Sequence, residues 1–384
     1  MLMRRTRWLT MSAAFAITLA ACSQGAPDDA TDDPGGPSPT EAGSTPDPLV
    51  DPDDIISGGP PPDGIPPIDD PKFVAPEEAA FLAGNEPVLA VEVGGEAKAY
   101  PLQIMTWHEI VNDVIGGVPV TVTYCPLCNT GIAFERPTFD GELLDFGTSG
   151  KLYNSNLVMY DRQTGSYWAQ ATGQAIVGDL VGEQLTFVPA RILSFADWRA
   201  GRPNGLVLST DTGFERPYGD NPYAFYESQG RAYFYTGLPD DRLGETERVL
   251  GIVRNGDIVA FPYAAVKAGA RNGWAVVTEV VGGDAVAVFW KAGTSSALDA
   301  EEIAEGRDVG AIAAYRPEVD GRALTFDVSR EGIVDHQTGS VWSILGQAVS
   351  GPLEGEQLVP ELAIDSFWFD WAAFHPKTRI FGWG

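Results

Sequence analysis

The residues best suited to chemistry in this chain are two cysteines separated by two residues. Cys125 and Cys128 stand in the run Tyr124-Cys-Pro-Leu-Cys-Asn129, which follows a β-branched stretch typical of a strand. Thiolates are nucleophiles and soft metal ligands, and a two-residue spacer places both sulfurs on one turn. Three kinds of chemistry fit this arrangement: a structural disulfide, a redox-active dithiol and a soft-metal site.

The disulfide is the simplest of the three. Closing so short a loop gains only about 2 kcal/mol before strain, and structural bridges in secreted proteins usually tie distant segments. A redox dithiol usually lies between a strand and a helix N-terminus, whose dipole supports the thiolate. Here Asn129-Thr-Gly-Ile-Ala-Phe134 favours a turn into another strand. A thiol–disulfide oxidoreductase, in which Cys125 attacks and Cys128 resolves, is therefore kept as an alternative interpretation, but its setting is not thioredoxin-like.

A metal site needs more ligands than two cysteines, because closed tetrahedral sites have about four. His108 lies upstream, on a short amphipathic helix that the spacing of apolar residues predicts over 103–115, and Met159 lies downstream. Cysteine, histidine and methionine together favour copper or zinc over magnesium or calcium. Our leading interpretation is a copper or zinc ion held by Cys125, Cys128 and His108, with Met159 as a further ligand.

Other chemistry has less support in the sequence. Glu109, beside His108, is expected to be an exposed helix residue, and His336 and His375 are interpreted as structural or surface residues. There is no Gly-x-Ser-x-Gly elbow, phosphate-binding glycine loop or His-Glu-x-x-His helix, so hydrolase and nucleotide-dependent reactions are not indicated. A cell-surface module for a small organic ligand is a third interpretation, based on the polar loop 147–156 and ten tryptophans.

The elements that must position these residues occur twice. Asp161-Arg-Gln-Thr-Gly-Ser-Tyr-Trp168 matches Asp335-His-Gln-Thr-Gly-Ser-Val-Trp342, and other matches follow in the same order. These are Gly173-Gln174 with Gly346-Gln347, Gly182-Glu-Gln-Leu185 with Gly355-Glu-Gln-Leu358, Asp197-Trp198 with Asp370-Trp371, and Ala99-Tyr-Pro101 with Ala260-Phe-Pro262. Ordered matches of this kind predict two related lobes from an internal duplication.

Each copy is expected to consist mostly of strands. A hairpin is predicted from Val88–Val93 through Gly94-Gly95 into Ala97–Tyr100, with further strands at 118–124 and 157–160. The predicted fold class is α+β and β-rich. Its parts are a first lobe over 73–210, an aromatic connector over 211–245 and a second lobe over 246–384.

The second copy acts as an internal control for the first. It aligns Phe289-Trp-Lys-Ala-Gly293 with the cysteine strand, has no counterpart of His108, and has Ile333 or Val334 in place of Met159. It also lacks an excess that includes 151–156. A fold that needed these residues for packing would need them twice. We therefore expect one functional site in the first lobe and a scaffold role for the second.

The N-terminus has the parts of an export signal. Arg4, Arg5 and Arg7 precede an apolar stretch too short to span a bilayer, and Leu19-Ala-Ala-Cys22 resembles a lipobox. We expect a signal peptide over 1–21 and lipidation of Cys22, with an ordinary cleaved signal peptide as the alternative. Residues 22–72 are rich in Pro, Asp, Gly and Ser, which predicts a disordered linker.

Charge limits the partners. The chain has 53 acidic against 25 basic residues and a formal net charge of −28, so nucleic acid is not an expected partner. The expected setting is the extracytoplasmic face of a cell membrane, reached through the lipid on Cys22. A metal or redox partner protein is expected but not identified.

A family resemblance runs over roughly 75–384. The chain resembles the domain of unknown function 3179 (DUF3179) family in a set of specific motifs. They are Trp107-His-Glu-Ile-Val-Asn-Asp113, Thr123-Tyr-Cys-Pro-Leu-Cys128, Phe146-Gly-Thr-Ser-Gly150, Asn156-Leu-Val-Met-Tyr-Asp161, Trp168 and Tyr218-Gly-Asp-Asn-Pro-Tyr223. The resemblance implies an extracytoplasmic or membrane-attached bacterial or archaeal protein, and it implies no particular activity.

Overall fold

The hairpin expected near 88–100 lies at the centre of a five-stranded sheet. In the computed structural model, which describes residues 46–383, β3 (Pro87–Val93) and β4 (Glu96–Pro101) pair antiparallel through Gly94 and Gly95, both at positive φ. Glycine suits such a turn because it has no Cβ to clash. The sheet order is β15-β3-β4-β16-β2, with β16 parallel to β4. The outer strands are β15 (Ala190–Ser194), β16 (Leu206–Leu208) and β2 (Phe73–Val74).

The cysteine motif lies in a second sheet, of order β14-β7-β6-β5. Its strands are β5 (Ile110–Ile115), β6 (Val118–Cys125), β7 (Thr130–Glu135) and β14 (Phe187–Val188). The helix predicted over 103–115 is therefore wrong in its second half: α1 (Leu102–His108) ends at His108. The β-branched residues after Glu109 pair with β6 instead, because the Gly116-Gly117 turn brings that strand alongside.

A third sheet has the order β1-β10-β11-β12-β13. Its strands are β1 (Ile55–Ser57), β10 (Phe146–Tyr153), β11 (Asn156–Asp161), β12 (Tyr167–Ala169) and β13 (Gln174–Val177). The segment 147–156, which was expected to be a polar loop, is mostly strand in this sheet, because it pairs with the residues that follow it in a hairpin. β1 belongs to the segment predicted to be disordered, so that prediction is wrong for residues 46–72. Edge pairing with β10 and a bridge from Ile68 to Val111 order this segment despite its composition.

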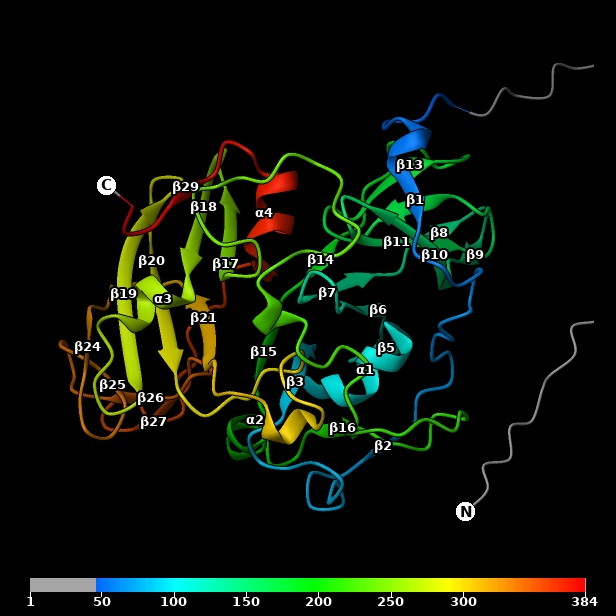
Figure 1. The fold of residues 1–384 in the computed structure, drawn as a ribbon. Helices are drawn as coiled ribbons and strands as arrows, with labels where there is room; N and C mark the ends of the chain where they lie inside the picture. The colour runs from blue at the N-terminus through cyan, green and yellow to red at the C-terminus, as the bar shows by residue number, and fades with distance from the viewer. Residues whose placement is uncertain (1–45, 384) are drawn as a thin grey trace, which may run out of the picture. The chain divides into compact units, whose positions relative to one another are not determined.

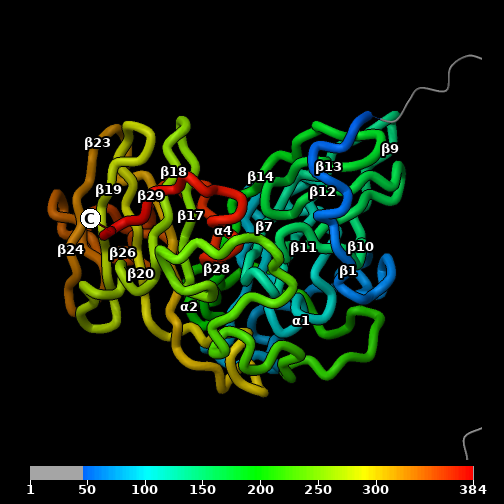
Figure 2. The backbone as a smooth tube through the Cα atoms, turned by 45° about the horizontal axis from the view of Figure 1, so that its top comes forward, coloured from blue at the N-terminus to red at the C-terminus, as the bar shows by residue number. Residues whose placement is uncertain are grey.

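The second half of the chain has sheets of the same strand order. β28-β17-β18-β29, with β29 parallel to β18, corresponds to β15-β3-β4-β16, and β19-β20-β21 corresponds to β5-β6-β7. The bounds are β17 (Arg248–Arg254), β18 (Asp257–Pro262), β19 (Trp274–Val281), β20 (Asp284–Lys291), β21 (Ala311–Tyr315), β28 (Ala363–Phe367) and β29 (Arg379–Ile380). Figure 1 labels these strands in the ribbon except β28, which is labelled in Figure 2.

The remaining sheets also correspond between the halves. A four-stranded sheet β24-β25-β26-β27 has the order of β10-β11-β12-β13, and the short hairpin β22–β23 has its counterpart in β8–β9. These strands are β24 (Phe326–Val328), β25 (Ile333–Asp335), β26 (Val341–Trp342), β27 (Ala348–Ser350), β22 (Glu318–Val319), β23 (Arg322–Ala323), β8 (Thr138–Phe139) and β9 (Glu142–Leu143).

The repeated Asp-x-Gln-Thr-Gly-Ser-x-Trp segment forms the same turn in both halves. The carboxylate of Asp161 accepts from the Trp168 indole at 2.9 Å, and Asp335 accepts from the Trp342 indole at 3.0 Å. Each aspartate also accepts from the threonine three residues on, so each carboxylate caps its own turn. The buried indole then ties the turn to the core, with Trp168 and Trp342 at most 1% exposed.

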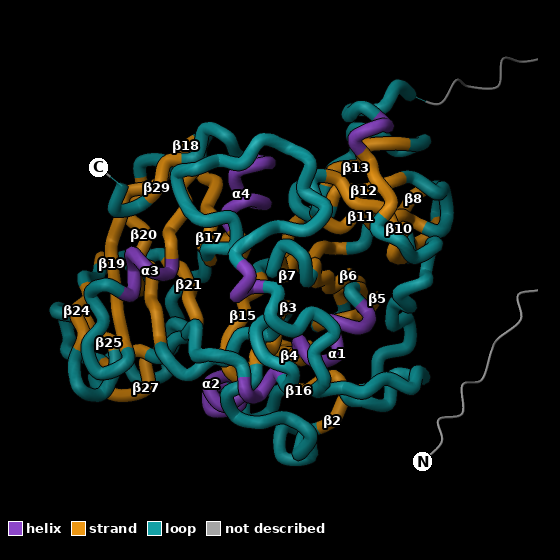
Figure 3. The backbone as a smooth tube through the Cα atoms, viewed as in Figure 1, coloured by secondary structure: helices purple, strands orange, loops and turns teal. Residues whose placement is uncertain are grey.

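Helices are few and short, so the fold is β-rich as expected (Figure 3). α2 (Phe195–Gly201) follows β15 and α4 (Trp368–Phe374) follows β28 directly, and α3 (Tyr263–Lys267) follows β18. Figure 2 shows the same backbone turned by 45°, with α4 in red. Three 3₁₀ turns complete the elements: η1 (Pro52–Asp54), η2 (Glu227–Gln229) and η3 (Ile303–Glu305). Within residues 46–383, no helix has the length and apolar character needed to span a membrane.

Candidate functional site

The cysteines lie on a tight turn that joins β6 to β7. The amide of Cys128 donates to the Cys125 carbonyl at 3.2 Å, and Asn129 has φ +51. Asparagine is one of the few non-glycine residues that tolerate this left-handed conformation, and its side chain accepts from the Tyr124 hydroxyl at 3.2 Å. The chain can therefore reverse directly into β7, which confirms the expected strand–turn–strand setting.

The two thiols are unbridged, close together and buried. Cys125 is 2% exposed and Cys128 is fully buried. Both sulfurs approach the carbonyl oxygen of Ser155, Cys128 at 3.4 Å and Cys125 at 3.9 Å. Burial raises the pKa of the Cys128 thiol well above its usual value, and a hydrogen bond with Cys125 and the charge of Asp370 raise it further. Cys128 therefore holds its proton at neutral pH until a base removes it.

Ser155 reaches the thiols because it lies at the tip of the β10–β11 hairpin. Asn154 and Ser155 both have positive φ, which is the geometry of a two-residue hairpin turn. This tip belongs to the segment 151–156, which has no counterpart in the second half of the chain. Asn156, the next residue, donates its side-chain amide to Asp370 at 2.9 Å. The hairpin tip therefore contributes two residues, Ser155 and Asn156, to the surroundings of the thiols.

Asp370 is the residue that the sequence did not place here. It lies in the first turn of α4, in the second half of the chain, and is 2% exposed. Its carboxylate accepts from Thr130 at 3.1 Å, from Ser366 at 2.8 Å and from Asn156. Burial raises the pKa of Asp370, while these donors and Cys128 oppose that rise. A buried carboxylate beside the second thiol is thus held by neutral donors alone.

The backbone of the second half also holds the cysteine turn. The amide of Phe367 donates to the Cys128 carbonyl at 2.8 Å. The Thr130 hydroxyl lies 3.1 Å from the same carbonyl, and its single proton goes either there or to Asp370. The second half was expected to be only a scaffold. Instead, the β28–α4 junction supplies both a main-chain donor and a carboxylate to the thiol site.

The corresponding place in the other half contains an ordinary ion pair. Asp197 has the same position in α2 as Asp370 in α4, and Lys291 ends β20 as Cys125 ends β6. Asp197 and Lys291 are bonded to each other. A lysine is the usual partner for a half-buried aspartate, whereas Asp370 has thiols and neutral donors in its place.

Aromatic residues of the connector cover the thiol turn. The Tyr226 hydroxyl donates to the Leu127 carbonyl at 2.8 Å, and its ring lies 4.7 Å from that of Tyr233 and 6.1 Å from that of Phe367. Ser155 donates to the Tyr233 carbonyl at 2.5 Å. Burial raises the pKa of Tyr226 far above its usual value, so it is a neutral donor. We call residues 223–235 the cover.

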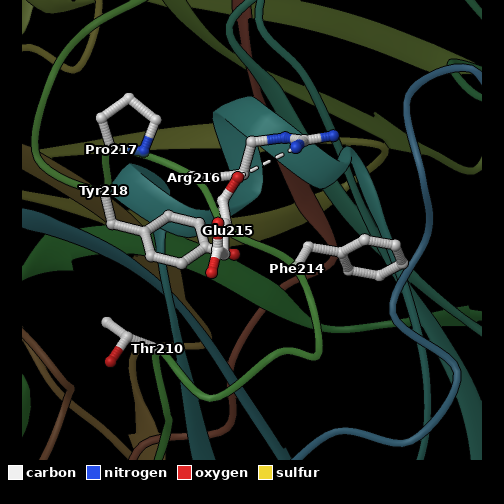
Figure 4. Close-up of a pocket in the computed structure, with 6 residues that line it drawn as sticks. All are labelled: Thr210, Phe214, Glu215, Arg216, Pro217 and Tyr218. Atoms are coloured by element: carbon white, nitrogen blue, oxygen red, sulfur yellow. Dashed lines mark hydrogen bonds between the residues drawn. The ribbon is translucent and has the colours of Figure 1, made fainter.

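The structure does not bring His108 to the thiols. One ring nitrogen lies 2.7 Å from the Pro66 carbonyl and the other 2.6 Å from the Tyr218 hydroxyl, so both are occupied. Tyr218 and Phe214 belong to a loop that borders a hollow of about 670 Å³ (Figure 4). Between residues 46 and 383, no three His, Cys, Asp or Glu side chains lie together in a way that could hold a metal ion. The expected set of Cys125, Cys128 and His108 is therefore not assembled.

The structure also places Met159 and Glu109, the two other residues of the first half for which the sequence suggested a role or an environment. Met159 is buried in β11, in the same hydrophobic cluster as both cysteines. Glu109 is not the exposed helix residue that was expected: it is 7% exposed, has φ +60 and lies 3.5 Å from the Tyr223 hydroxyl. Burial raises its pKa to about 8.

The residues that the sequence missed share one property. Asp370, Ser366 and Phe367 lie about 240 positions after the cysteines. The only available signal was the match of Asp370-Trp371 to Asp197-Trp198, which indicated a repeated structural element.

Five cavities stand out in the described part of the chain, and neither thiol lines any of them.

A β-rich fold of two topologically matching halves, with a buried dithiol turn in the first, defines the class of protein. The chain belongs to the family described as "Protein of unknown function (DUF3179)", whose model matches residues 62–378. Comparison with curated proteins and with solved structures found no significant match. The chemistry must therefore be argued from the site itself.

Proposed function

We propose that this protein catalyses thiol–disulfide exchange with Cys125 and Cys128. One observation carries the proposal: a buried carboxylate, Asp370, lies beside the second thiol and has no cationic partner among residues 46–383. A structural thiol pair needs no such neighbour, since burying a carboxylate costs stability. A resolving thiol with a raised pKa does need a local proton acceptor, because only the thiolate attacks a disulfide.

The reaction follows from these roles. The Cys125 thiolate attacks one sulfur of a substrate disulfide, forming a mixed disulfide and releasing the first substrate thiolate. Cys128 then gives its proton to the Asp370 carboxylate and attacks the Cys125 sulfur. This step closes the Cys125–Cys128 disulfide and releases the second substrate thiolate, so two electrons pass to the substrate. A dithiol donor reduces the pair again, and the same steps reversed oxidise a dithiol substrate.

The cover must open for a substrate to reach Cys125. Its contacts with the thiol turn and the Ser155 hairpin are the Tyr226 hydroxyl on the Leu127 carbonyl, Ser155 on the Tyr233 carbonyl, and the tilted and edge-on packing of the aromatic rings. Glu227 of the cover is anchored separately, by a buried ion pair with Arg248. Local opening of such a segment costs less than global unfolding. The exchange rate should therefore rise when Tyr226→Phe removes one of these hydrogen bonds.

The test uses the mature chain, reduced and then mixed with glutathione disulfide, with thiols counted by mass spectrometry. We expect Cys128→Ser to accumulate a mixed disulfide at Cys125, and Cys125→Ser to accumulate none. Asp370→Asn should slow closure of the pair about 100-fold, which is a typical contribution of positioned proton transfer. In the native chain closure should slow as acid protonates Asp370, and the variant should lack this acid dependence.

Asp197→Asn is the matched control, because it changes the equivalent aspartate of the other half. It should leave the rate of closure unchanged. The proposal is wrong if Asp370→Asn closes as fast as the native chain. It is also wrong if the pair stays reduced even when mild urea opens the cover.

Copper or zinc binding at the same thiols is a second candidate. It is favoured by the convergence of both sulfurs on one side of the turn, since soft thiolates select these metals. Its further ligand would be Met159 or the Ser155 carbonyl in place of His108. Elemental analysis of reduced protein should then show one metal per chain that is lost in a Cys125→Ser/Cys128→Ser variant. Equal metal in both proteins excludes this candidate.

We further propose that the protein is exported, anchored by lipid on Cys22, and built by internal duplication. The lipobox and Cys22 lie outside the described residues, and the proposal is supported by the sequence alone. The duplication is supported by the matching sheet orders and by the repeated Asp161 and Asp335 turns. An extracytoplasmic location would place the dithiol in an oxidising compartment where disulfide substrates occur.

A further inference from the structure

A cavity of about 310 Å³ lies where α4 packs beside β14, β17 and β28. Its walls are mostly apolar and include Phe187, Leu362 and the Trp371 ring, with His375 as the main polar group. None of its lining residues carries a formal charge at neutral pH, because burial lowers the pKa of His375. Its size is at the lower end for small-molecule sites.

The first half of the chain contains the corresponding place, and there it is closed. Trp198 and the helix-terminal Arg202 occupy in α2 the positions of Trp371 and His375 in α4. Both tryptophans line a cavity, but the one beside Trp198 has a volume of only about 10 Å³. The two halves therefore provide a comparison between a filled and an open version of one site.

Leu345 fills the closed version. It lines the small cavity and packs against α2 so tightly that a Cβ on Gly201 would lie 2.3 Å from its side chain. The residue at the matching position, directly before the repeated Gly-Gln, is Thr172. Thr172 is shorter than leucine and leaves the second cavity open.

The walls differ in charge as well as in shape. In the first half, Arg191 of β15 pairs with Ala90 of β3; in the second half, Ile364 of β28 stands in the place of Arg191 and pairs with Gly251 of β17. Glu92 lies two residues after Ala90 in β3, and Val253 has the same position in β17. Glu92 forms an ion pair with Arg202 at 2.8 Å. The charged groups that close the first site are thus replaced by apolar groups in the second.

We infer that the cavity between α4 and β17 is a binding site for an uncharged, largely apolar ring compound with one polar group. The apolar walls and the lack of charge in a strongly acidic protein exclude ionic ligands. The Trp371 ring offers an aromatic surface for stacking. Among the described residues, neither ring nitrogen of His375 has a hydrogen-bond partner, so the neutral imidazole is free to bond a hydroxyl, carbonyl or amine.

The experiment titrates N-phenyl-1-naphthylamine, an uncharged two-ring fluorophore with one N–H group, into the folded mature chain. We expect saturable binding at one molecule per chain. Thr172→Leu restores the filling side chain of the other half, and Val253→Glu restores its charge. Each should weaken binding at least about tenfold. Val253 is 49% exposed, so its substitution should leave the fold intact, which circular dichroism checks.

Thr186→Leu is the matched control, since Thr186 is exposed and lies outside the cavity. It should bind the probe as the native chain does. The inference is overturned if Thr172→Leu and Val253→Glu both bind normally, or if the native chain binds none. It is also overturned if Val253→Glu instead separates a dimer in sedimentation, because the apolar walls would then belong to a contact between two copies.

Discussion

Single residues decide the chemistry of the thiol site through their local environment. Burial raises the pKa of both the Cys128 thiol and the Asp370 carboxyl group. The charge of Asp370 raises the pKa of Cys128 further, whereas the hydrogen bond from Cys128 lowers that of Asp370. Glu109 is a second buried carboxyl group near this region, and the Tyr223 hydroxyl, at 3.5 Å, is its one side-chain hydrogen-bond partner in the described chain. Burial is the main cause that raises the pKa of both Asp370 and Glu109, and hydrogen bonds have the smaller, opposing effect.

The raised pKa of Glu109 predicts how stability depends on pH. The folded state retains this proton up to about pH 8, whereas the unfolded chain loses it near the ordinary value of 4.5. The folded state therefore binds more protons between these values, and stability must fall as pH rises through that window. The loss due to Glu109 should be about 3–5 kcal/mol.

Urea unfolding of the native chain and of Glu109→Gln at several pH values between 4.5 and 8 checks this prediction. The difference between the two proteins isolates Glu109 from other buried groups, such as Asp365, whose pKa is raised to about 6. Glu109→Gln should be the more stable protein at pH 8. A difference that stays constant across the window would contradict the prediction.

At the scale of elements, α4 has two faces with different roles. Asp370 contacts the thiol turn, whereas Trp371 and His375, four residues apart, share the face that lines the cavity. Trp371 lies directly on β17, where a Cβ on Gly251 would be 2.1 Å from its ring. The glycine thus sets how closely this helix approaches the strand.

Gly251→Ala should therefore destabilise the protein by about 1–3 kcal/mol, because the added methyl group must displace a packed indole. Thermal unfolding measures the loss. Gly269→Ala is the control, since a Cβ there meets nothing within 4 Å and the position needs no positive φ. Equal melting temperatures for the two variants would show that Trp371 can shift without cost.

For the whole molecule, each half completes a site in the other. Asp370 of the second half meets the thiol turn of the first, and Asp197 of the first half meets Lys291 of the second. The described residues, 46–383, lie within a single compact unit, in agreement with these exchanged contacts. The two topologically matching halves thus place a thiol turn beside one aspartate and a lysine beside the other.

The proposed location of the whole molecule, anchored by lipid on Cys22, can be tested directly. Cells labelled with palmitate should incorporate label into the native protein and into Cys128→Ala, but not into Cys22→Ala. Because stable anchoring needs more than one acyl chain on this residue, Cys22→Ala should also leave the membrane fraction. Label retained by Cys22→Ala would refute lipidation at this site.

The sequence by itself determined the features that depend on neighbouring residues. The hairpin through Gly94-Gly95, the repeated Asp161 and Asp335 turns, and the strand–turn–strand setting of Cys125 and Cys128 all follow from local backbone preferences and short-range hydrogen bonds. The helix predicted beyond His108 failed because pairing with β6 outweighed helical periodicity.

Only the tertiary structure decided which distant groups meet. It brought Asp370 to Cys128 across about 240 residues, turned His108 to Pro66 and Tyr218, and ordered β1 on the edge of β10. Such contacts depend on which faces of the sheets and helices pack together, and no local pattern in the chain encodes that choice. The thiols were visible in the sequence, but the buried carboxylate beside them was not.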